Sequence, residues 1–315
     1  LVLALGSVTD KSGLESDGEN VFTLKTLRDS MLIRNHIIGV FEQAAVEPDT
    51  ERQRQLLTFV VCGAGYTGVQ VVTELRDFIY RHLTRFYTMI DPRNIKIVLV
   101  EAEPKILAGM PPKLGGYAMR QLQRMDIDVR LNSRITSVRN HCIEINHEQQ
   151  MHTSTLLWVA GIVANPRIAE LDVEKDSIGR ILVNQYLEVT GTSGVYALGD
   201  CAHFKDPGTG QPIPPRAHTT VRQAKVVSHN ILAELRGWDK APYIYSNNAE
   251  MVSLGASKAV FRFYNFRIYG FPARLIWLAG YSMLVTGTYN RVRILMDWGL
   301  SLIFGRDTTY LKLKR

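Results

Sequence analysis

The chain has 315 residues, a formal net charge of +7 and 46% hydrophobic residues. This length is sufficient for two domains with separate cores, and the composition excludes a mostly disordered protein. The three cysteines, Cys62, Cys142 and Cys201, are far apart and form no CxxC pair. We therefore expect reduced, mostly buried thiols in a reducing compartment, and redox chemistry that depends on a dithiol is disfavoured.

Three apolar segments end in a small residue and a glycine: Leu1–Ser7, Leu156–Ile162 and Gly194–Asp200. Runs of this kind are typical of strands buried on both faces of an α/β sheet. A glycine at the carboxyl end lets the backbone come close to a ligand. One such run could be an ordinary buried strand, but three favour nucleotide binding. Because the chain opens inside the first run, we expect that an N-terminal portion is missing.

A dinucleotide-binding turn is predicted between the first two runs. Gly63, Gly65 and Gly68 form a GxGxxG motif that follows a predicted strand at Leu56–Cys62 and opens a predicted helix. In this context the first glycine allows the tight turn, the second leaves room for a pyrophosphate and the third permits close packing. The helix N-terminus then favours the negative phosphates.

Glu101 follows the next predicted strand, Ile95–Val100. A carboxylate there can accept hydrogen bonds from ribose hydroxyls and would repel a 2′-phosphate, so NADH is favoured over NADPH. Glu101 lies 33 positions after Gly68 (101 − 68), whereas the usual interval is about 20. A longer helix through His82 and a loop at 91–94 would explain the difference.

A flavin site is indicated by Gly199 and Asp200, which follow a GRxxV segment at residues 179–183. The aspartate can accept a hydrogen bond from a ribityl or ribose hydroxyl, although a Gly-Asp pair is also a common turn. A proline-led helix follows and ends before Gly237. Its N-terminus would stabilise negative charge on the pyrimidine side of a reduced flavin. The expected apolar stripe of this helix is Val221, Ala224, Val227, Ile231 and Leu235.

The order of these motifs resembles the type II NADH:quinone oxidoreductases, single-subunit NADH dehydrogenases that do not pump protons. Trp298 and the FGRD letters at 304–307 resemble the family's C-terminal membrane-docking region. The resemblance implies that two electrons pass from NADH through FAD to a membrane quinone. It also implies that a first dinucleotide fold, which would hold the FAD adenylate, precedes Leu1.

The resemblance assigns residues to three groups. The NADH residues are Gly63, Gly65, Gly68, Glu101 and Gly161, the FAD residues are Gly6, Ser7, Gly199 and Asp200, and the flavin–quinone residues are Ala217, His218 and Gln223. Two positions depart from the family. Gln70 replaces a glutamate near the nicotinamide and flavin, and an amide cannot carry a proton to the reduced quinone. His218 replaces a glutamine, and it is either a proton donor or a tolerated substitution. The predicted catalytic residues are Gln70, His218 and Gln223.

The expected fold class is α/β, with two nested Rossmann-like dinucleotide-binding domains, the FAD domain incomplete at its N-terminus, and a C-terminal membrane-docking region. The FAD domain is predicted at residues 1–51 and 165–240, the NADH domain at 52–164 and the C-terminal region at 241–315. Residues 262–315 contain nine basic and two acidic side chains, which equals the whole net charge.

Aromatic and basic side chains alternate in this C-terminal region, a mixture that suits the headgroup layer of a membrane. Its longest uncharged run, Leu275–Asn290, has 16 residues and is too short and polar to span a bilayer, which needs about 18–20. We therefore expect a peripheral membrane protein on the cytoplasmic side of a bacterial membrane or on the mitochondrial inner membrane. Nucleic-acid binding is disfavoured, a homodimer interface is an alternative use of the region, and no spacing indicates a metal site.

Two other functions are compatible with the motifs. A soluble NADH-dependent flavoprotein reductase would depend little on the C-terminal region. A nucleotide-binding protein without turnover is compatible with Gln70 and His218 and would bind NADH without reducing a flavin.

Overall fold

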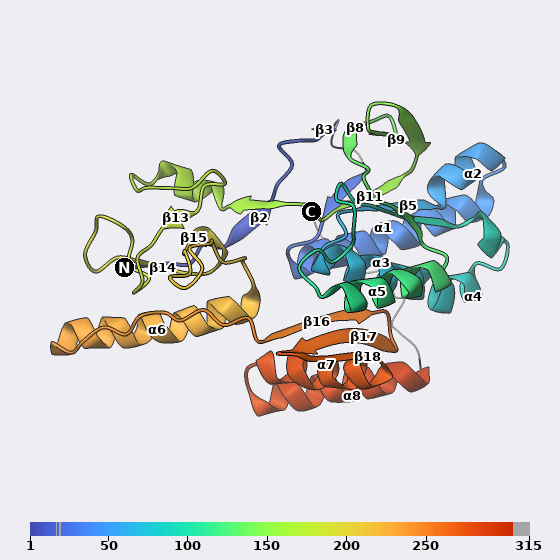
Figure 1. Ribbon diagram of the computed structural model, residues 1–315. Coiled ribbons are helices and arrows are strands. Elements are labelled where there is room, and N and C mark those ends of the chain that lie inside the picture. Colours follow the sequence, from blue (N-terminus) through green and yellow to red (C-terminus); the bar gives the residue numbers. More distant parts are fainter. Residues whose placement is uncertain (17, 19, 305–315) are drawn as a thin grey trace. The chain divides into compact units, whose positions relative to one another are not determined.

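The computed structural model describes residues 1–16, 18 and 20–304, which form two compact units (Figure 1). The first unit contains Leu1–Asp10 and Gly161–Asn247, and the second contains Lys11–Ala160 and the chain from Asn248 onward. Each unit is therefore assembled from two separate stretches of chain. The divisions fall after residues 10, 160 and 247, and not after 51, 164 and 240 as the sequence suggested.

A five-stranded parallel sheet forms the centre of the second unit, in the order β4-β11-β5-β6-β7. Its strands are β4 (Val21–Thr23), β11 (Thr155–Trp158), β5 (Thr58–Cys62), β6 (Lys96–Val100) and β7 (Asp128–Arg130). All residues of β5 and β11 are buried, as expected for parallel strands covered on both faces.

The two faces of this sheet are covered by different layers. Phe59 and Val61 share a core with three helices, α1 (Leu27–Val46), α3 (Tyr66–Phe78) and α5 (Pro112–Arg124). Val60 and Cys62, which alternate with them along β5, share a second core with β8 (Ile135–Arg139) and β9 (Cys142–Ile145). These strands form a small sheet with β10 (Gln149–His152) and β3 (Glu15–Ser16).

Residues 11–51 belong to the second unit, which corrects their assignment to the FAD domain. The reason is that β4 pairs in parallel with β11, more than 130 residues later in the chain. Helix α1 follows, with a capping box in which the Thr26 hydroxyl accepts from Asp29 N and the Asp29 carboxylate accepts from Thr26 N. Its apolar side chains then pack into the same core as β5.

The long interval between Gly68 and Glu101 has the predicted cause. Helix α3 continues without a break into η1 (Ile79–Leu83), which is a π-helix, and then into α4 (Thr84–Phe86). A loop with the short helix η2 (Pro92–Asn94) leads to β6.

The first unit consists of short strand pairs and one long helix. The pairs are β1 (Val2–Leu3) with β14 (Tyr196–Ala197), β2 (Ser7–Thr9) with β12 (Ile162–Ala164), and β13 (Ile181–Leu182) with β15 (Ala202–His203). The prediction that Leu1–Ser7 is a strand buried on both faces is wrong, because Leu1 and Leu5 are exposed. Within the described part of the chain, β1 has β14 as its single strand neighbour.

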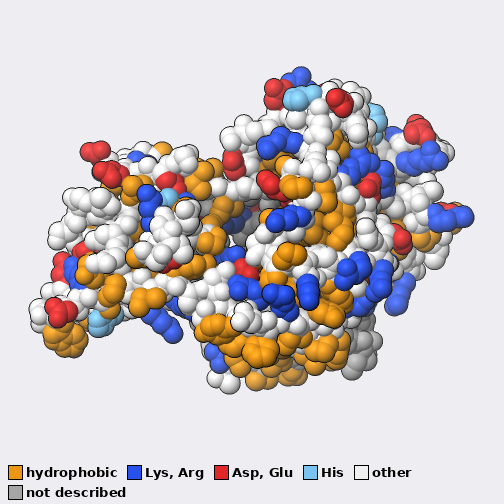
Figure 2. All heavy atoms as spheres, viewed as in Figure 1, with side chains coloured by type: hydrophobic (Ala, Val, Ile, Leu, Met, Phe, Trp, Pro, Cys, Tyr) orange, Lys and Arg blue, Asp and Glu red, His pale blue; other side chains and the backbone are white. Residues whose placement is uncertain are grey.

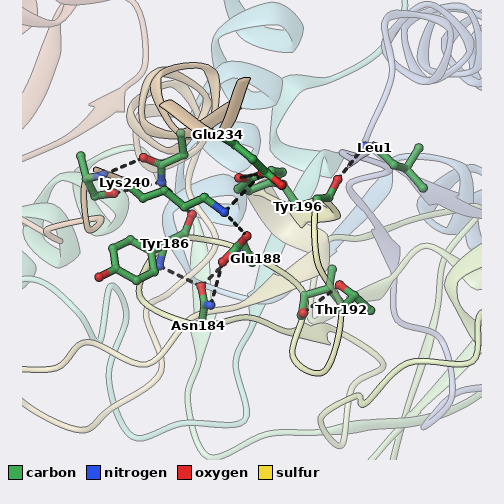
Figure 3. Close-up of polar contacts among 12 residues, drawn as sticks. Leu1, Asn184, Tyr186, Glu188, Thr192, Tyr196, Glu234 and Lys240 are labelled. Carbon is green, nitrogen blue, oxygen red and sulfur yellow. Dashed lines mark hydrogen bonds and ion pairs between the residues drawn. The ribbon is translucent and has the colours of Figure 1, made fainter. Parts of the chain in front are cut away.

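Polar side chains hold these short segments together (Figure 3). Lys240 Nζ lies 2.6 Å from Glu188 Oε1 and 3.2 Å from Glu234 Oε2. The buried Tyr196 donates its hydroxyl to Glu234 at 2.9 Å. The hydrogen bond to Glu188 is the main cause of a pKa of Lys240 above its ordinary value, so this ammonium stays charged.

Helix α6 (Ala217–Arg236) ends at Gly237 in the left-handed conformation, as predicted, but its buried face differs from the expected stripe. Val221, Ala224 and Leu235 are exposed. The buried side chains are Thr219, Gln223, Val227, Asn230 and Ala233. Polar residues are tolerated there because the backbone satisfies them: the Asn230 amide donates to the carbonyls of Tyr186 and Ala241 at 3.0 Å and accepts from Ala241 N at 2.8 Å.

The C-terminal region is part of the second unit and does not form a separate body. It contains an antiparallel sheet of β16 (Ala249–Leu254), β17 (Lys258–Phe263) and β18 (Phe266–Gly270), followed by α7 (Phe271–Leu284) and α8 (Thr288–Phe304). Val252, Leu254 and Val260 pack into the core that Phe59 and Val61 share with α1, α3 and α5. Helix α7 packs against this antiparallel sheet and against α8 (Figure 1). Of the FGRD letters, residues 305–307 lie outside the described residues, as do the last basic residues of the chain.

In the part of the chain that the structure describes, no helix is both long and apolar enough to cross a bilayer.

A histidine links α1 to the central sheet. His36 Nε2 lies 3.0 Å from the carbonyl oxygen of Ser154 and 2.9 Å from Thr155 Oγ1, and its ring centre lies 4.3 Å from that of Phe22. Burial lowers the pKa of His36 from 6.5 to about 4, against a smaller opposing effect of the hydrogen bond to Ser154. The histidine is therefore neutral in the folded protein at neutral pH.

We expect the free energy of unfolding to fall as the pH decreases from 7 to 5, in part because of His36. The folded-state pKa lies below the unfolded value of 6.5, so the stabilising contribution is complete above that pH and is lost as the pH falls towards 4. The expected loss between pH 7 and 5 is about 2 kcal/mol. Urea unfolding at both pH values measures it.

His36→Gln should reduce this pH dependence, whereas His147→Gln, at an exposed position, should leave it unchanged. Equal pH dependence in the original protein and His36→Gln would contradict the assignment.

Candidate nucleotide-binding and flavin sites

The glycine motif forms a tight turn between β5 and α3. Gly63 has φ +101°, and a Cβ atom built on it would lie 3.0 Å from Ala160 Cα. A Cβ atom on Gly68 would lie 1.6 Å from the Gly63 carbonyl oxygen, so only glycine fits this approach. A Cβ atom on Gly65 would meet no described atom within 4 Å. Two glycines are thus required by the protein itself, and the third faces open space.

Glu101 is brought to this turn by β6. Its Oε2 atom accepts from Ala64 N and its Oε1 atom accepts from Glu103 N at 3.0 Å. Gly65 is the N-cap of α3 and has no side chain to bind the first amide groups of the helix. Those amides, the helix dipole and the carboxylate therefore lie together at the carboxyl end of the parallel strands, where ligands bind in open α/β sheets.

The other residues assigned to NADH and hydride transfer have different positions. Gln70 lies in α3, two positions after Gly68, and is partly buried. Gly161 has φ +72° and belongs to the first unit, where its carbonyl accepts from Asp10 N at 3.3 Å. Of the five residues assigned to NADH, four therefore lie together in the second unit.

The first unit contains all four residues assigned to FAD. Ser7 Oγ donates to Asp200 Oδ2 at 2.7 Å, which joins positions 193 residues apart. Gly199 N donates to Gln223 Oε1 at 2.8 Å, so α6 is tied to the turn that carries Asp200. A Cβ atom on Gly199 would lie 3.0 Å from Thr220 Cγ2, and Gly199 has φ +78°. Gly6 also has positive φ and directly precedes Ser7, the first residue of β2.

Ala217 and His218 form the first turn of α6, and His218 is partly buried. The Arg216 side chain at the N-cap makes no capping hydrogen bond to this helix. Thr219 is 97% buried (3% exposed), and its Oγ1 atom makes no hydrogen bond to a described residue. A buried hydroxyl without a partner is unfavourable, so this turn is suited to a polar ligand. The sequence analysis did not include Thr219, because a lone threonine in a helix carries no distinctive signal.

The sequence analysis also missed a largely buried polar cluster of Asp176, Arg180 and His203 in the first unit. Arg180 Nε donates to Asp176 Oδ2 at 2.7 Å, and His203 Nδ1 lies 2.8 Å from the same oxygen. Burial would raise the pKa of Asp176, but hydrogen bonds from Arg180 and His203 lower it below its ordinary value. The spacing Asp176-x₃-Arg180, in which Arg180 belongs to the GRxxV segment, is the signal that could have revealed this pair.

The expected burial of the cysteines is confirmed for two of the three. All three are free, and Cys62 and Cys201 are buried. Burial raises the pKa of Cys62 to about 12, so the thiol next to the glycine turn is not a nucleophile near neutral pH.

Known proteins share the sequence pattern and the fold of this chain. A family model described as pyridine nucleotide-disulphide oxidoreductase matches residues 1–224. The chain belongs to this family of oxidoreductases. It is 30% identical to "Probable NADH dehydrogenase" of Dictyostelium discoideum, over 98% of this chain and 68% of that protein. It is 31% identical to "Type II NADH:quinone oxidoreductase NdhA" of Mycobacterium tuberculosis, over 96% of this chain and 66% of that protein.

These relatives confirm the predicted group, the type II NADH:quinone oxidoreductases. The oxidoreductase chain spans about two thirds of the length of the curated relatives it matches. The structure of NDH2 from Plasmodium falciparum in complex with NADH has the same fold, with a TM-score of 0.88 and 16% identity over 98% of this chain and 78% of that one.

We expect Gly65→Ala to weaken NADH binding and Gly68→Ala to lower the stability of the protein. Alanine fits the φ of −68° at Gly65 and meets no protein atom, so the thermal midpoint should stay within about 2 °C while NADH binding weakens at least about tenfold. Gly68→Ala should lower the thermal midpoint, because its Cβ collides with the Gly63 carbonyl. Thermal unfolding and titration of NADH fluorescence measure the two effects. Unchanged NADH affinity in Gly65→Ala would rule out this turn as the NADH site.

Proposed function

We propose that the protein transfers two electrons from NADH through FAD to a membrane quinone, without pumping protons. The observation that supports this most directly is the presence of two nucleotide-type turns, one in each unit. Gly63–Gly68 and Glu101 form the first, and Ser7, Gly199 and Asp200 form the second. When bound, FAD supplies the chemistry by accepting a hydride from NADH and passing the electrons to the quinone.

The turn in the second unit would hold NADH. The amide groups at the start of α3 would donate to the pyrophosphate, and the open space at Gly65 would let it approach the backbone. Each carboxylate oxygen of Glu101 accepts one backbone hydrogen bond, from Ala64 N or Glu103 N, and can accept further hydrogen bonds from a ribose. The same carboxylate would repel the 2′-phosphate of NADPH.

The first unit has residues that fit a flavin. Asp200 would accept a hydrogen bond from a ribityl hydroxyl while Ser7 holds the carboxylate in place. The first turn of α6 would donate to the pyrimidine oxygens, and Thr219 would supply its buried hydroxyl, which has no hydrogen-bond partner among the described residues. Gln223 would act as a positioning residue, because it fixes the Gly199 turn relative to α6.

Anaerobic addition of NADH tests the proposed function. The flavin content of this chain, and of the longest form that its gene encodes, is measured first. NADH should then bleach the flavin and a quinone should restore its absorbance. A protein that binds NADH but contains no flavin, or flavin that NADH does not bleach, would favour a nucleotide-binding protein without turnover.

His218 would deliver a proton to the reduced quinone, since Gln70 cannot. We expect His218→Gln to lower the rate of quinone reduction about tenfold to a hundredfold, while flavin bleaching by NADH continues at its original rate. His229→Gln, on an exposed face of the same helix, is the control and should change neither rate. Stopped-flow measurement of the two half-reactions separates them. Equal rates in His218→Gln and the original protein would mean that histidine is only tolerated at this position.

The C-terminal helices would dock on a membrane surface. Figure 2 shows hydrophobic side chains gathered over α7 and α8. Exposed members include Phe271, Leu275, Met283, Leu284, Tyr289, Val292, Leu295 and Met296. The ring centres of Trp277 in α7 and Trp298 in α8 lie 6.1 Å apart. Arg291 and Arg293 are exposed on α8. Apolar side chains beside aromatic rings and arginines suit the interface of a bilayer with anionic lipid.

We expect the double substitution Met283→Glu and Met296→Glu to reduce co-sedimentation with anionic lipid vesicles at least about tenfold, since it places two charges on the docking face. Met89→Glu is a matched control at another exposed methionine of the same unit and should bind vesicles normally. A change in the mass of the protein in solution without a change in vesicle binding would instead indicate a homodimer interface. Absence of vesicle binding by the original protein would favour the soluble reductase.

A further inference from the structure

A tyrosine inside the glycine motif connects the nucleotide turn to the C-terminal sheet. Tyr66 is the first residue of α3 and directly follows Gly65. Its hydroxyl donates to Glu250 Oε1 in β16 at 2.8 Å. Arg262 in β17 donates from Nε to Glu250 Oε2 at 2.9 Å, and Glu250 and Arg262 are paired across the two strands. All three residues belong to the second unit.

The carboxylate at the centre of this chain is well fixed. The Glu250 side chain is only 1% exposed, and that of Arg262 is 19% exposed. A buried carboxylate is stable only when charged and hydrogen-bonding groups surround it, so its position is strongly determined by its partners. The Tyr66 hydroxyl is therefore anchored to a rigid acceptor.

The anchor lies next to a glycine, where the backbone has few intrinsic restrictions. Gly65 has more conformational freedom than any residue with a side chain, and the N–H groups of the following residues have no partner within the helix. Fixing the Tyr66 ring restricts the backbone directly after Gly65. The orientation of the first amides of α3 then depends on β16 as well as on β5.

The other end of α3 is tied to the same sheet. Asp77 Oδ2 accepts from Ala256 N at 2.7 Å, in the turn between β16 and β17. Asp77 is buried, and Arg81 donates to its Oδ1 atom at 3.1 Å. Helix α3 is thus held at both ends by a sheet that packs against α7 on its other side (Figure 1).

We propose that Tyr66 is a positioning residue for NADH, and that the Tyr66–Glu250–Arg262 chain couples NADH binding to the stability of the C-terminal sheet. This inference rests on the proposed NADH site. A ligand that fixes the first amides of α3 favours the same arrangement as the Glu250 anchor, so each stabilises the other. Such coupling is reciprocal by thermodynamic necessity.

Tyr66→Phe tests the proposal, because it removes one oxygen atom and keeps the ring. The dissociation constant of NADH, measured by fluorescence titration on the full chain, should rise about threefold to tenfold. Hydrogen–deuterium exchange of residues 250–263 should slow when NADH binds to the original protein, and this protection should be smaller in the variant. A merely structural tyrosine would change the exchange rate equally with and without NADH.

Tyr80→Phe is the matched control. Its hydroxyl lies 3.4 Å from the Pro92 carbonyl and 3.5 Å from the Ile95 carbonyl in the same unit, away from the glycine turn. It should leave both NADH affinity and the NADH-dependent protection unchanged. Unchanged affinity in Tyr66→Phe, or an equal loss in Tyr80→Phe, would overturn the inference alone. Failure of the original protein to bind NADH would overturn the proposed function and the inference with it.

Discussion

Both faces of the central parallel sheet are apolar and must be buried, and most elements of the second unit pack against one face or the other. Every residue of β5 is buried, with alternate side chains in two separate cores. Helices cover one face and the small sheet of β3, β8, β9 and β10 covers the other. Ligands of open α/β sheets bind at the carboxyl ends of the strands. The glycine turn and Glu101 lie at that edge because the chain must leave β5 and β6 there.

Different interactions hold the two units together. The second has a large apolar core, whereas the first has two smaller apolar clusters and strand pairs of two or three residues, with side-chain hydrogen bonds between its segments. Lys240, Glu188 and Glu234 connect its segments, and Ser7–Asp200 and Gly199–Gln223 connect its proposed flavin residues. Such polar contacts determine orientation more strictly than apolar packing does, because their strength depends on both distance and angle.

Local signals in the sequence predicted the nucleotide turn, the long helical segment after it and the two ends of α6. These features depend on glycine, proline and apolar spacing within about 20 residues. The placement of residues 11–51 was wrong because it depends on β4 pairing with β11, a contact between distant parts of the chain. The pattern of Leu1–Ser7 correctly predicted extended chain, since β1 forms at Val2–Leu3 and β2 begins at Ser7. It did not predict the exposure of Leu1 and Leu5, because burial depends on neighbouring strands.

The buried face of α6 shows a second limit of hydrophobic patterns. Gln223 and Asn230 are inside because backbone groups from other segments satisfy their amides, and no periodicity can reveal such partners. The same holds for Tyr66 and Glu250, which are 184 positions apart. Residue types and motifs therefore located the glycines and acids of both proposed sites, while the side chains that orient them were visible only in the structure.

The π-helix η1 has a consequence for how the chain can vary in length. An extra residue inside an α-helix rotates everything after it by about 100°, which would turn the following side chains away from the core. A π-helical turn confines the extra residue to one widened turn. Ile79 and Leu83, at its two ends, both remain fully buried. An insertion between the glycine turn and Glu101 can therefore be absorbed locally, with the two halves of the nucleotide site left at the distance that binding requires.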